Sequence, residues 1–169
     1  MRQTERSPEA GFTLIEIVVV MILIGVLAAL AIPRFPTYPT AGVAARRLLS
    51  DVRYAKELSA RLQTMCGIYF ETNTKYRLFT NNNISNYAKD PHTGTNYEVN
   101  MTGEFSGVTL SQTFTESILK FDSLGSPFEG DGVPPPETAL AAAKSVTVSG
   151  SGGPRTVTIE PNTGKVTGS

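Results

Sequence analysis

The pattern of hydrophobic and polar positions separates an apolar N-terminal stretch from a longer remainder in which the two kinds of residue alternate. Residues 17–33 carry no charged or polar side chain, and from Phe12 onward only Thr13 and Glu16 interrupt the apolar run. A helix of this length is roughly 30 Å long, which matches the hydrocarbon thickness of a bilayer. The pattern therefore predicts a transmembrane helix over residues 12–33.

The next part of the chain changes to an amphipathic pattern. Three prolines between residues 33 and 42 predict a break, which we place at residues 34–42. Over residues 43–65, apolar residues recur at spacings of three and four, which predicts a helix with one face on a sheet. The charges of this segment are mixed in sign and are interpreted as a solvated face. The apolar positions are Leu48, Val52, Ala55, Leu58, Leu62 and Met65, and the charged ones are Arg46, Arg47, Asp51, Arg53, Lys56, Glu57 and Arg61.

From Cys66 onward the pattern has a period of two, which predicts strands. Residues 66–72 and 75–80 are separated by Asn73-Thr74 and predict a hairpin. One long N-terminal helix followed by strands predicts an α+β fold, with the helix packed on an antiparallel β-sheet head over residues 66–169. Further strands are expected at residues 96–100, 107–110, 118–122, 145–149, 155–161 and 164–167, and loops at 81–96, 122–137 and 150–154.

Composition adds limits on the chemistry of the chain. The 15 basic and 15 acidic residues give a net charge of zero, whereas a general nucleic-acid binder usually has a basic surplus. One cysteine, Cys66, excludes an internal disulfide and a multi-cysteine metal site. One histidine, His92, leaves little for a histidine-based metal site. We therefore expect no metal, no cofactor and no enzymatic activity.

Glu16 is the feature of the apolar run that needs an explanation. A carboxylate within lipid is costly unless it is paired or protonated. The next basic residue downstream is Arg34, which lies beyond helical reach. A cationic partner must therefore come from another chain, or from an amine created by cutting this one. A secretory signal peptide and a plain membrane anchor both account for the apolar run, but neither accounts for Glu16.

The segment Gly11-Phe12-Thr13-Leu14-Ile15-Glu16, followed by the apolar run, resembles a type IV prepilin signal. The resemblance implies that a prepilin peptidase cuts between Gly11 and Phe12, removes residues 1–11 as a leader and methylates the new amine of Phe12. It also places Glu16 fifth in the mature chain, where pilins carry the glutamate of subunit assembly. This glutamate is expected to neutralise the Phe12 ammonium of a neighbouring subunit within lipid.

Gly25 and Pro33 occupy the positions at which pilin helices carry a loosening glycine and a kinking proline, so the resemblance implies that they make the helix flexible. Proline removes a backbone donor, and glycine adds backbone entropy. Both residues are also common in ordinary membrane helices. Two interpretations stay open: tolerated membrane-helix residues, or a stretch that partly unwinds when subunits pack into a filament.

Segments of the head resemble the GspH/FimT-type minor pseudopilins. These are residues 47–58, 118–125 and 156–166. The resemblance implies a structural subunit of a type II secretion or type IV pilus filament, anchored in the inner membrane with its head in the periplasm. The implied partners are other pilin or pseudopilin subunits, the prepilin peptidase, inner-membrane lipid and the secretion or pilus assembly platform.

Two alternatives to this role are a major pilin and a minor pilin that binds DNA during uptake. The DNA-binding members of the resembled family carry a basic C-terminal region. Here the tail from Lys144 offers only Lys144, Arg155 and Lys165, against Glu160. A nucleic-acid partner is therefore disfavoured.

The remaining candidate chemistry lies in the head. Cys66 and His92 suggest a thiol–imidazole pair, but no third group or oxyanion loop accompanies them. The loop at Asp90 and the segment 122–131 contain oxygen ligands of the kind that calcium uses, without EF-hand spacing, and are interpreted as solvated turns. Glycosylation sequons begin at two asparagines, Asn83 and Asn100.

Overall fold

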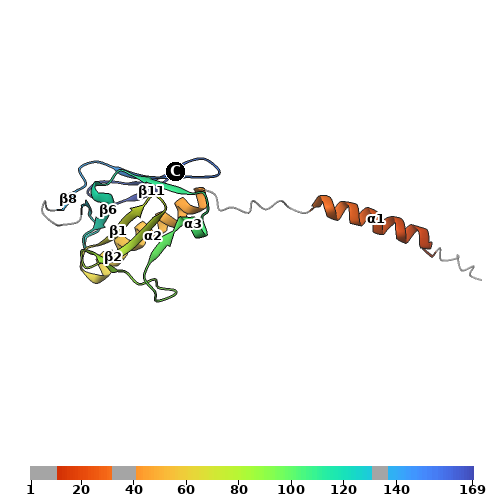
Figure 1. Cartoon of the computed structure of the whole chain (residues 1–169), viewed down its shortest axis with the longest axis horizontal. Coiled ribbons are helices and arrows are strands. Elements are labelled where there is room, and N and C mark those ends of the chain that lie inside the picture. Colours follow the sequence, from red (N-terminus) through yellow and green to blue (C-terminus); the bar gives the residue numbers. More distant parts are fainter. Residues whose placement is uncertain (1–10, 32–40, 131–136) are drawn as a thin grey trace, which may run out of the picture. The chain divides into compact units, whose positions relative to one another are not determined.

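The described residues that precede residue 32 contain one helix. A computed structural model describes residues 11–31, 41–130 and 137–169, and divides the chain into two compact units between residues 36 and 37. The first unit contains α1 (Leu14–Ala31), an α-helix that continues through Gly25 (Figure 1). Pro33 and most of the predicted break at residues 34–42 lie outside the described residues.

The second unit contains α2 (Ala41–Leu62) and two antiparallel sheets, so the predicted α+β fold is confirmed. Within the described residues, the larger sheet has the order β3-β2-β1-β6-β7-β8, with β4 also pairing β2, and the smaller has the order β11-β10-β9-β5. The larger sheet contains β1 (Cys66–Thr72), β2 (Lys75–Thr80), β3 (Asn83–Tyr87), β4 (Glu98–Asn100), β6 (Ile118–Phe121), β7 (Pro127–Glu129) and β8 (Thr138–Ala139). The smaller contains β5 (Thr109–Gln112), β9 (Lys144–Ser149), β10 (Arg155–Ile159) and β11 (Val166–Gly168), and the short helices are α3 (Met101–Glu104) and the 3-10 turn Thr115–Ser117.

Helix α2 begins two residues before the predicted start and ends three residues before the predicted end. Gln63 adopts a left-handed conformation (φ 52°), which stops the helix after Leu62. Leu62 is consequently 47% exposed, and Met65 lies beyond the helix, so neither continues the buried stripe as predicted. The stripe instead extends toward the N-terminus through small residues that allow close packing. Its buried members are Ala41, Ala44, Ala45, Leu48, Asp51, Val52, Ala55, Leu58 and Ser59.

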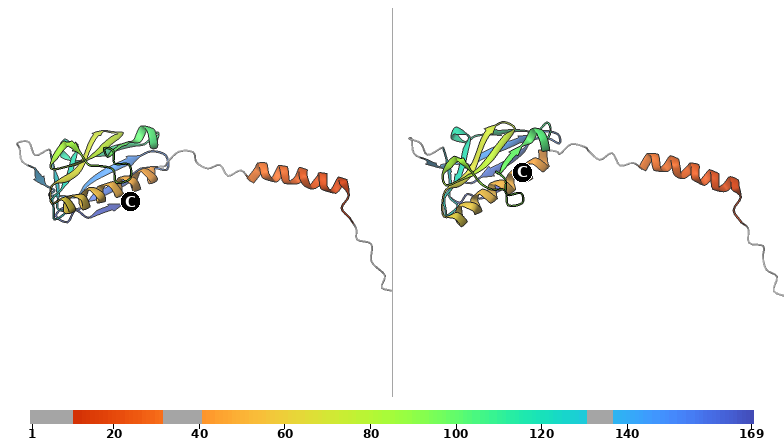
Figure 2. Two further views of the ribbon diagram at one scale, coloured as in Figure 1. Left: turned by 90° about the horizontal axis from the view of Figure 1, so that it is seen from below. Right: turned by 60° about the horizontal axis from the view of Figure 1, so that its bottom comes forward.

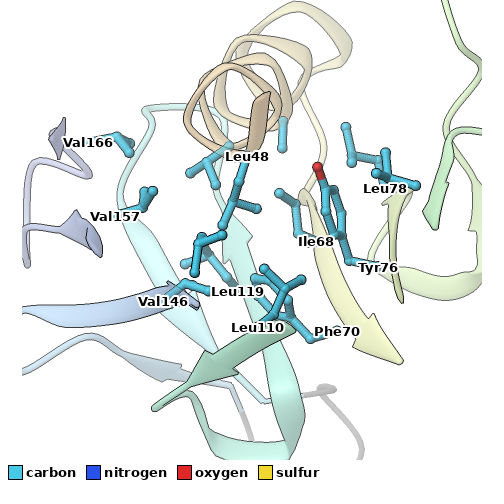
Figure 3. Packing of buried hydrophobic residues seen from close by; sticks show 14 of the residues in the cluster. Leu48, Ile68, Phe70, Tyr76, Leu78, Leu110, Leu119, Val146, Val157 and Val166 are labelled. Atoms are coloured by element: carbon cyan, nitrogen blue, oxygen red, sulfur yellow. The ribbon is translucent and has the colours of Figure 1, made fainter. Parts of the chain in front are cut away.

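The core lies between α2 and both sheets. Helix α2 contacts β1 and β6 of the larger sheet and β9, β10 and β11 of the smaller one, and it runs along one side of the strands (Figure 2). Leu48 points from the helix into the space between the sheets (Figure 3). Side chains of the two sheets flank it: Ile68, Tyr76 and Leu78 on one side, and Val146, Val157 and Val166 on the other.

Two predicted loops contain strands. Residues 81–96 were expected to form a loop, but β3 lies within them because Asn81 and Asn82, both at positive φ (56° and 53°), make a tight turn after β2. Its side chains are exposed or half-buried on both faces, which removes the alternation that marks a strand in sequence. The segment 122–137 likewise contains β7, which begins at Pro127.

Gly67 marks a close approach between neighbouring strands of the larger sheet. It is paired with Phe79 on β2 and with Lys120 on β6. A Cβ atom at this position would collide with the carbonyl oxygen of Leu119 and would lie 2.9 Å from the Phe79 ring. The sheet therefore requires a residue without a side chain at this point.

We predict that Gly67→Ala lowers the free energy of unfolding of the head by about 1–3 kcal/mol, because the added methyl group overpacks the sheet. Urea unfolding followed by circular dichroism measures this difference. The matched control is Gly103→Ala in α3, where a Cβ atom meets nothing within 4 Å, and its change should stay below about 1 kcal/mol. Equal effects of the two substitutions would contradict the packing argument.

Candidate functional site

The start of α1 is organised by Thr13. Residues 11–13 are not helical, and the helix begins at Leu14. The backbone N–H of Glu16 donates to Thr13 Oγ1 (3.3 Å) and to the Thr13 carbonyl oxygen (3.1 Å). Threonine followed three residues later by glutamate is the capping-box pattern, and the positive end of the helix dipole favours a carboxylate there. The cap that Thr13 provides was readable in the sequence but was not predicted.

The surface of α1 is apolar and open. Phe12 is 79% exposed, and Glu16 is also exposed. The bond between Gly11 and Phe12 thus lies in an accessible, non-helical segment. A shallow strip along one side of the helix is lined by Phe12, Glu16, Ile17, Val20, Met21 and Ile24. An exposed apolar surface of this kind marks a site of contact with lipid or with other protein chains.

None of the helices in the described part of the chain is both long enough and apolar enough to cross a membrane. The transmembrane helix over residues 12–33 therefore stays a prediction. Gly25 lies in continuous helix, and a Cβ atom there would meet nothing within 4 Å.

In the head, one of the buried charged groups is the carboxylate of Asp51. It is 2% exposed, although the mixed charges of this segment were interpreted as a solvated face that included Asp51. That interpretation was wrong, because Asp51 follows Leu48 by three residues and falls on the buried stripe. The hydroxyls of Tyr76 and Tyr97 donate to its two oxygens at 2.6 and 2.8 Å, and Arg47 Nε lies 3.2 Å away. The cluster ties α2 to β2 and to the loop before β4.

Burial governs the protonation of this cluster. It raises the pKa of Asp51 above its ordinary value, and the hydrogen bonds from Tyr76 and Tyr97 offset the rise only in part. Burial and the neighbouring carboxylate raise the pKa of both tyrosines. Burial acts to lower the pKa of Arg47, but the Asp51 carboxylate outweighs it, and the net shift is upward. The guanidinium therefore stays charged beside Asp51.

A cavity of about 210 Å³ adjoins the cluster, and His92 is on its lining together with Arg47 and Tyr97. Cys66 is not on this lining: it is fully buried at the start of β1, its thiol contacts the carbonyl oxygen of Thr64 at 3.6 Å, and burial raises its pKa. The suggested thiol–imidazole pair is thus not brought together around this cavity.

The candidate calcium loops and sequons have local structural roles. Asp90 Oδ1 accepts from the backbone N–H of His92 (2.7 Å), and Asp122 Oδ1 accepts from those of Leu124 and Ser126 (2.9 and 2.7 Å). Asn83 and Asn100 bond in the same way to the backbone two residues on, Asn100 as the cap of α3. In residues 11–31, 41–130 and 137–169, no three His, Cys, Asp or Glu side chains are placed to hold a metal ion.

The basic residues of the C-terminal part lie on or next to three different strands of the smaller sheet. Lys144 Nζ lies 3.2 Å from a Glu129 carboxylate oxygen and donates to the carbonyl oxygen of Thr113 at 2.9 Å. Arg155 and Lys165 are exposed on other segments of the tail. Lys144 is therefore already engaged within the head.

Comparison with known proteins gives one sequence match and a small set of structural ones. Residues 6–32 match the family described as the prokaryotic N-terminal methylation motif. No curated protein matches the chain. The structure of the minor pseudopilin EpsH from the type 2 secretion system of Vibrio cholerae is similar with a TM-score of 0.54 and 10% identity, covering 78% of this chain and 97% of that one. Two crystal structures of the type IV minor pilin FimU from Pseudomonas aeruginosa each have a TM-score of 0.47, at 13% and 14% identity, covering 75% and 73% of this chain and 90% and 84% of theirs.

The motif and the fold together confirm the predicted resemblance to type IV pilin-like proteins. The motif covers the N-terminal segment that contains Gly11, Phe12 and Glu16. The likeness to EpsH extends over most of the chain and, at its low identity, establishes the pilin fold. The roles of the individual residues stay predictions.

The buried carboxyl of Asp51 predicts the pH dependence of stability. Because burial raises its pKa above 3.8, the folded chain binds this proton more tightly than the unfolded chain. The contribution of Asp51 to the free energy of unfolding is fully present below the ordinary pKa, which applies to the unfolded chain. It is lost as the pH rises through the raised pKa of the folded chain. The free energy of unfolding, relative to Asp51→Asn, should therefore increase as the pH falls toward about 4, by at most about 1.4 kcal/mol per pH unit. Urea unfolding of both chains at a series of pH values measures it, and a decrease would show that the ion pair with Arg47 dominates.

Proposed function

We propose that this chain is a structural subunit, a minor pseudopilin or minor pilin, of a type II secretion or type IV pilus filament. The observation that carries the proposal is the methylation motif on an exposed apolar helix, whose first turn presents Glu16 beside Phe12. The head has the fold of a minor pseudopilin, which supports the same class. That neighbour is a minor pseudopilin of a type 2 secretion system, and the role proposed for this chain needs no catalytic site.

Processing is the first step of the proposed function. A prepilin peptidase cuts the accessible bond between Gly11 and Phe12 and methylates the amine that this creates. The methylated amine retains its positive charge. The helix then begins with a cation at Phe12 and, four residues later, an exposed carboxylate at Glu16. Each subunit can therefore pair its Phe12 amine with the Glu16 carboxylate of one neighbour, and its own Glu16 carboxylate with the Phe12 amine of another.

Assembly follows from the low polarity around the helix. The attraction between an ammonium and a carboxylate is many times stronger in an apolar medium than in water. An unpaired charge in lipid is costly, so a subunit that pairs Glu16 with the Phe12 amine of its neighbour is favoured over one that does not. The exposed apolar side chains of α1 add contacts with neighbouring helices and with inner-membrane lipid. Gly25 and Pro33 are proposed to let the helix adjust during this packing.

The head contributes a rigid body on the periplasmic side. Its α2 is held to both sheets by apolar contacts and by the Asp51 cluster. We propose that other pilin or pseudopilin subunits and the secretion or pilus assembly platform contact this head. A DNA-uptake role has no comparable support, because Lys144 already pairs with Glu129.

Processing predicts a defined mass. The intact mass of the membrane-extracted protein should show the loss of residues 1–11 and the gain of one methyl group on Phe12. Gly11→Val should leave the chain uncut, because a bulky side chain then precedes the scissile bond. Gly25→Ala is the matched control and should be processed normally. An uncut native chain, or a cut near Ala31, would remove the pilin interpretation.

Substitutions at Glu16 separate charge pairing from helix capping. Glutamine also suits the third position of a capping box but carries no charge. Glu16→Gln should therefore reduce incorporation into filaments at least about tenfold, which corresponds to about 1.4 kcal/mol. Thr13→Ala removes the cap and keeps the charge, so it should incorporate far better. Immunoblotting of sheared filaments against total protein measures both, and normal incorporation of Glu16→Gln would refute the charge-pairing mechanism.

A further inference from the structure

A lysine is buried in the middle of the larger sheet. Lys120 belongs to β6 (labelled in Figure 1), which pairs with β1 on one side and β7 on the other, and its side chain is 0% exposed. Its register partner on β1 is Gly67, where a Cβ atom would lie 2.9 Å from the Lys120 Cα. Lysine is almost never fully buried without a partner, because the ammonium loses its hydration. The groups that contact its Nζ atom must therefore explain how the buried ammonium is stabilised.

Two side chains from other parts of the sequence meet this ammonium. Lys120 Nζ lies 2.8 Å from the side-chain carbonyl oxygen of Asn82 and 3.3 Å from a carboxylate oxygen of Glu137. The Asn82 side-chain nitrogen donates to the same Glu137 oxygen. An amine, a carboxamide and a carboxylate thus contact one another pairwise. They come from the centre of the sheet, from the turn between β2 and β3, and from the residue before β8.

The backbone holds these three groups in place. Asn82 has φ 53°, and its backbone N–H donates to the carbonyl oxygen of Met65 at 2.8 Å. Glu137 directly precedes β8, which pairs β7, and β7 pairs β6. Each side chain therefore projects from a segment that is tied to the sheet. Such fixed positions supply much of the advantage of an intramolecular reaction, for which effective concentrations of about 10⁵ M and above are known.

We propose that Lys120 and Asn82 join in an intramolecular amide bond between Lys120 Nζ and Asn82 Cγ, with Glu137 as the proton-transfer group. The Glu137 carboxylate takes a proton from the ammonium, and the free amine attacks Cγ. Glu137 then passes this proton to the side-chain nitrogen of Asn82, which it already contacts, and that nitrogen leaves as ammonia. As the C–N bond to ammonia breaks, Nζ gives up its second proton to Glu137, which hands it to the departing ammonia, so that ammonium is released and Glu137 is again a carboxylate. One C–N bond forms and one breaks, so the step needs no oxidant, metal or external reagent.

The distances place the reacting atoms near each other. A carbonyl C–O bond is about 1.2 Å long, so Nζ at 2.8 Å from Oδ1 lies no more than about 4 Å from Cγ. Glu137 is within contact of both the nucleophile and the leaving group, which is the geometry that a general acid–base requires. The three contacts therefore fit the whole sequence of proton transfers.

The product also removes an unfavourable feature of the sheet. Before reaction a full positive charge is buried, and the attraction of a partner only partly repays its desolvation. The amide is neutral, and the charge leaves with the released ammonium. The new bond would tie β6 to the β2–β3 turn across β1, and would close the chain between residues 82 and 120 into a loop. Loop closure restricts the unfolded chain, as a disulfide does.

Peptide mapping of the full-length native protein tests the proposal. After tryptic digestion, tandem mass spectrometry should detect a branched peptide in which the segments containing residues 82 and 120 are joined. Its mass should equal the sum of the two minus one ammonia, and trypsin should not cleave after Lys120. Two linear peptides, with cleavage after Lys120, would overturn the proposal. Loss of ammonia from the Asn82 peptide without a branch would overturn it too, because that product is a cyclic imide.

Variants identify the roles of Lys120 and Glu137. Lys120→Arg should abolish the branched peptide, since guanidinium is not a nucleophile here, and Glu137→Gln should abolish it or slow its formation at least about tenfold. The matched control is Asn83→Ala: the Asn83 side chain accepts from the backbone N–H of Ser85, so the branched peptide should persist. An unchanged yield of the branched peptide in Glu137→Gln would refute the role of that carboxylate. The peptide map of the native protein tests the amide bond itself, and this test does not require any variant to fold.

Discussion

The burial of one face of α2 against two sheets at once is the interaction on which the head depends. Neither sheet alone covers the helix, because β1 and β6 meet it from one side and β9 to β11 from the other. Leu48 lies where these surfaces converge (Figure 3). Small side chains at Ala44, Ala45 and Ala55 let the strands approach the helix axis closely. Packing against α2 therefore joins residues of both sheets into one core.

The sequence predicted this architecture because its signals are local. Spacings of three and four gave the helix, and a period of two gave β1, β2, β6, β9 and β10 nearly to the residue. The misses have physical causes as well. The β3 strand lacks an apolar face, and the end of α2 depends on the left-handed conformation of Gln63. Pairing order and the division into two sheets are set by contacts between distant segments, which periodicity does not encode.

The functional residues likewise include some that the sequence predicted and some that it did not. The N-terminal motif was predictable because its residues are consecutive, so Gly11, Phe12 and Glu16 identify themselves by order alone. The buried charged residues of the head could not be identified in this way. In the sequence, Asp51 resembles a surface residue of a helix and Lys120 resembles a surface residue of a strand. Burial of a charge is decided by partners far away in sequence, such as Tyr76 and Tyr97 for Asp51. Only the folded chain brings these partners together.

The charges of Asp51, Lys120 and Glu16 are subject to the same constraint: a charge that is removed from water needs a compensating group. Asp51 meets it within the head, through two hydroxyls and a guanidinium. Lys120 meets it through Asn82 and Glu137, in a geometry that also fits conversion to a neutral amide. Glu16 stands exposed on an apolar helix, and in the assembly that we propose it becomes buried when that helix enters lipid or a filament. Its compensating group then comes from a neighbouring subunit, so the rule that stabilises the head would also make incorporation of the proposed subunit depend on a neighbour.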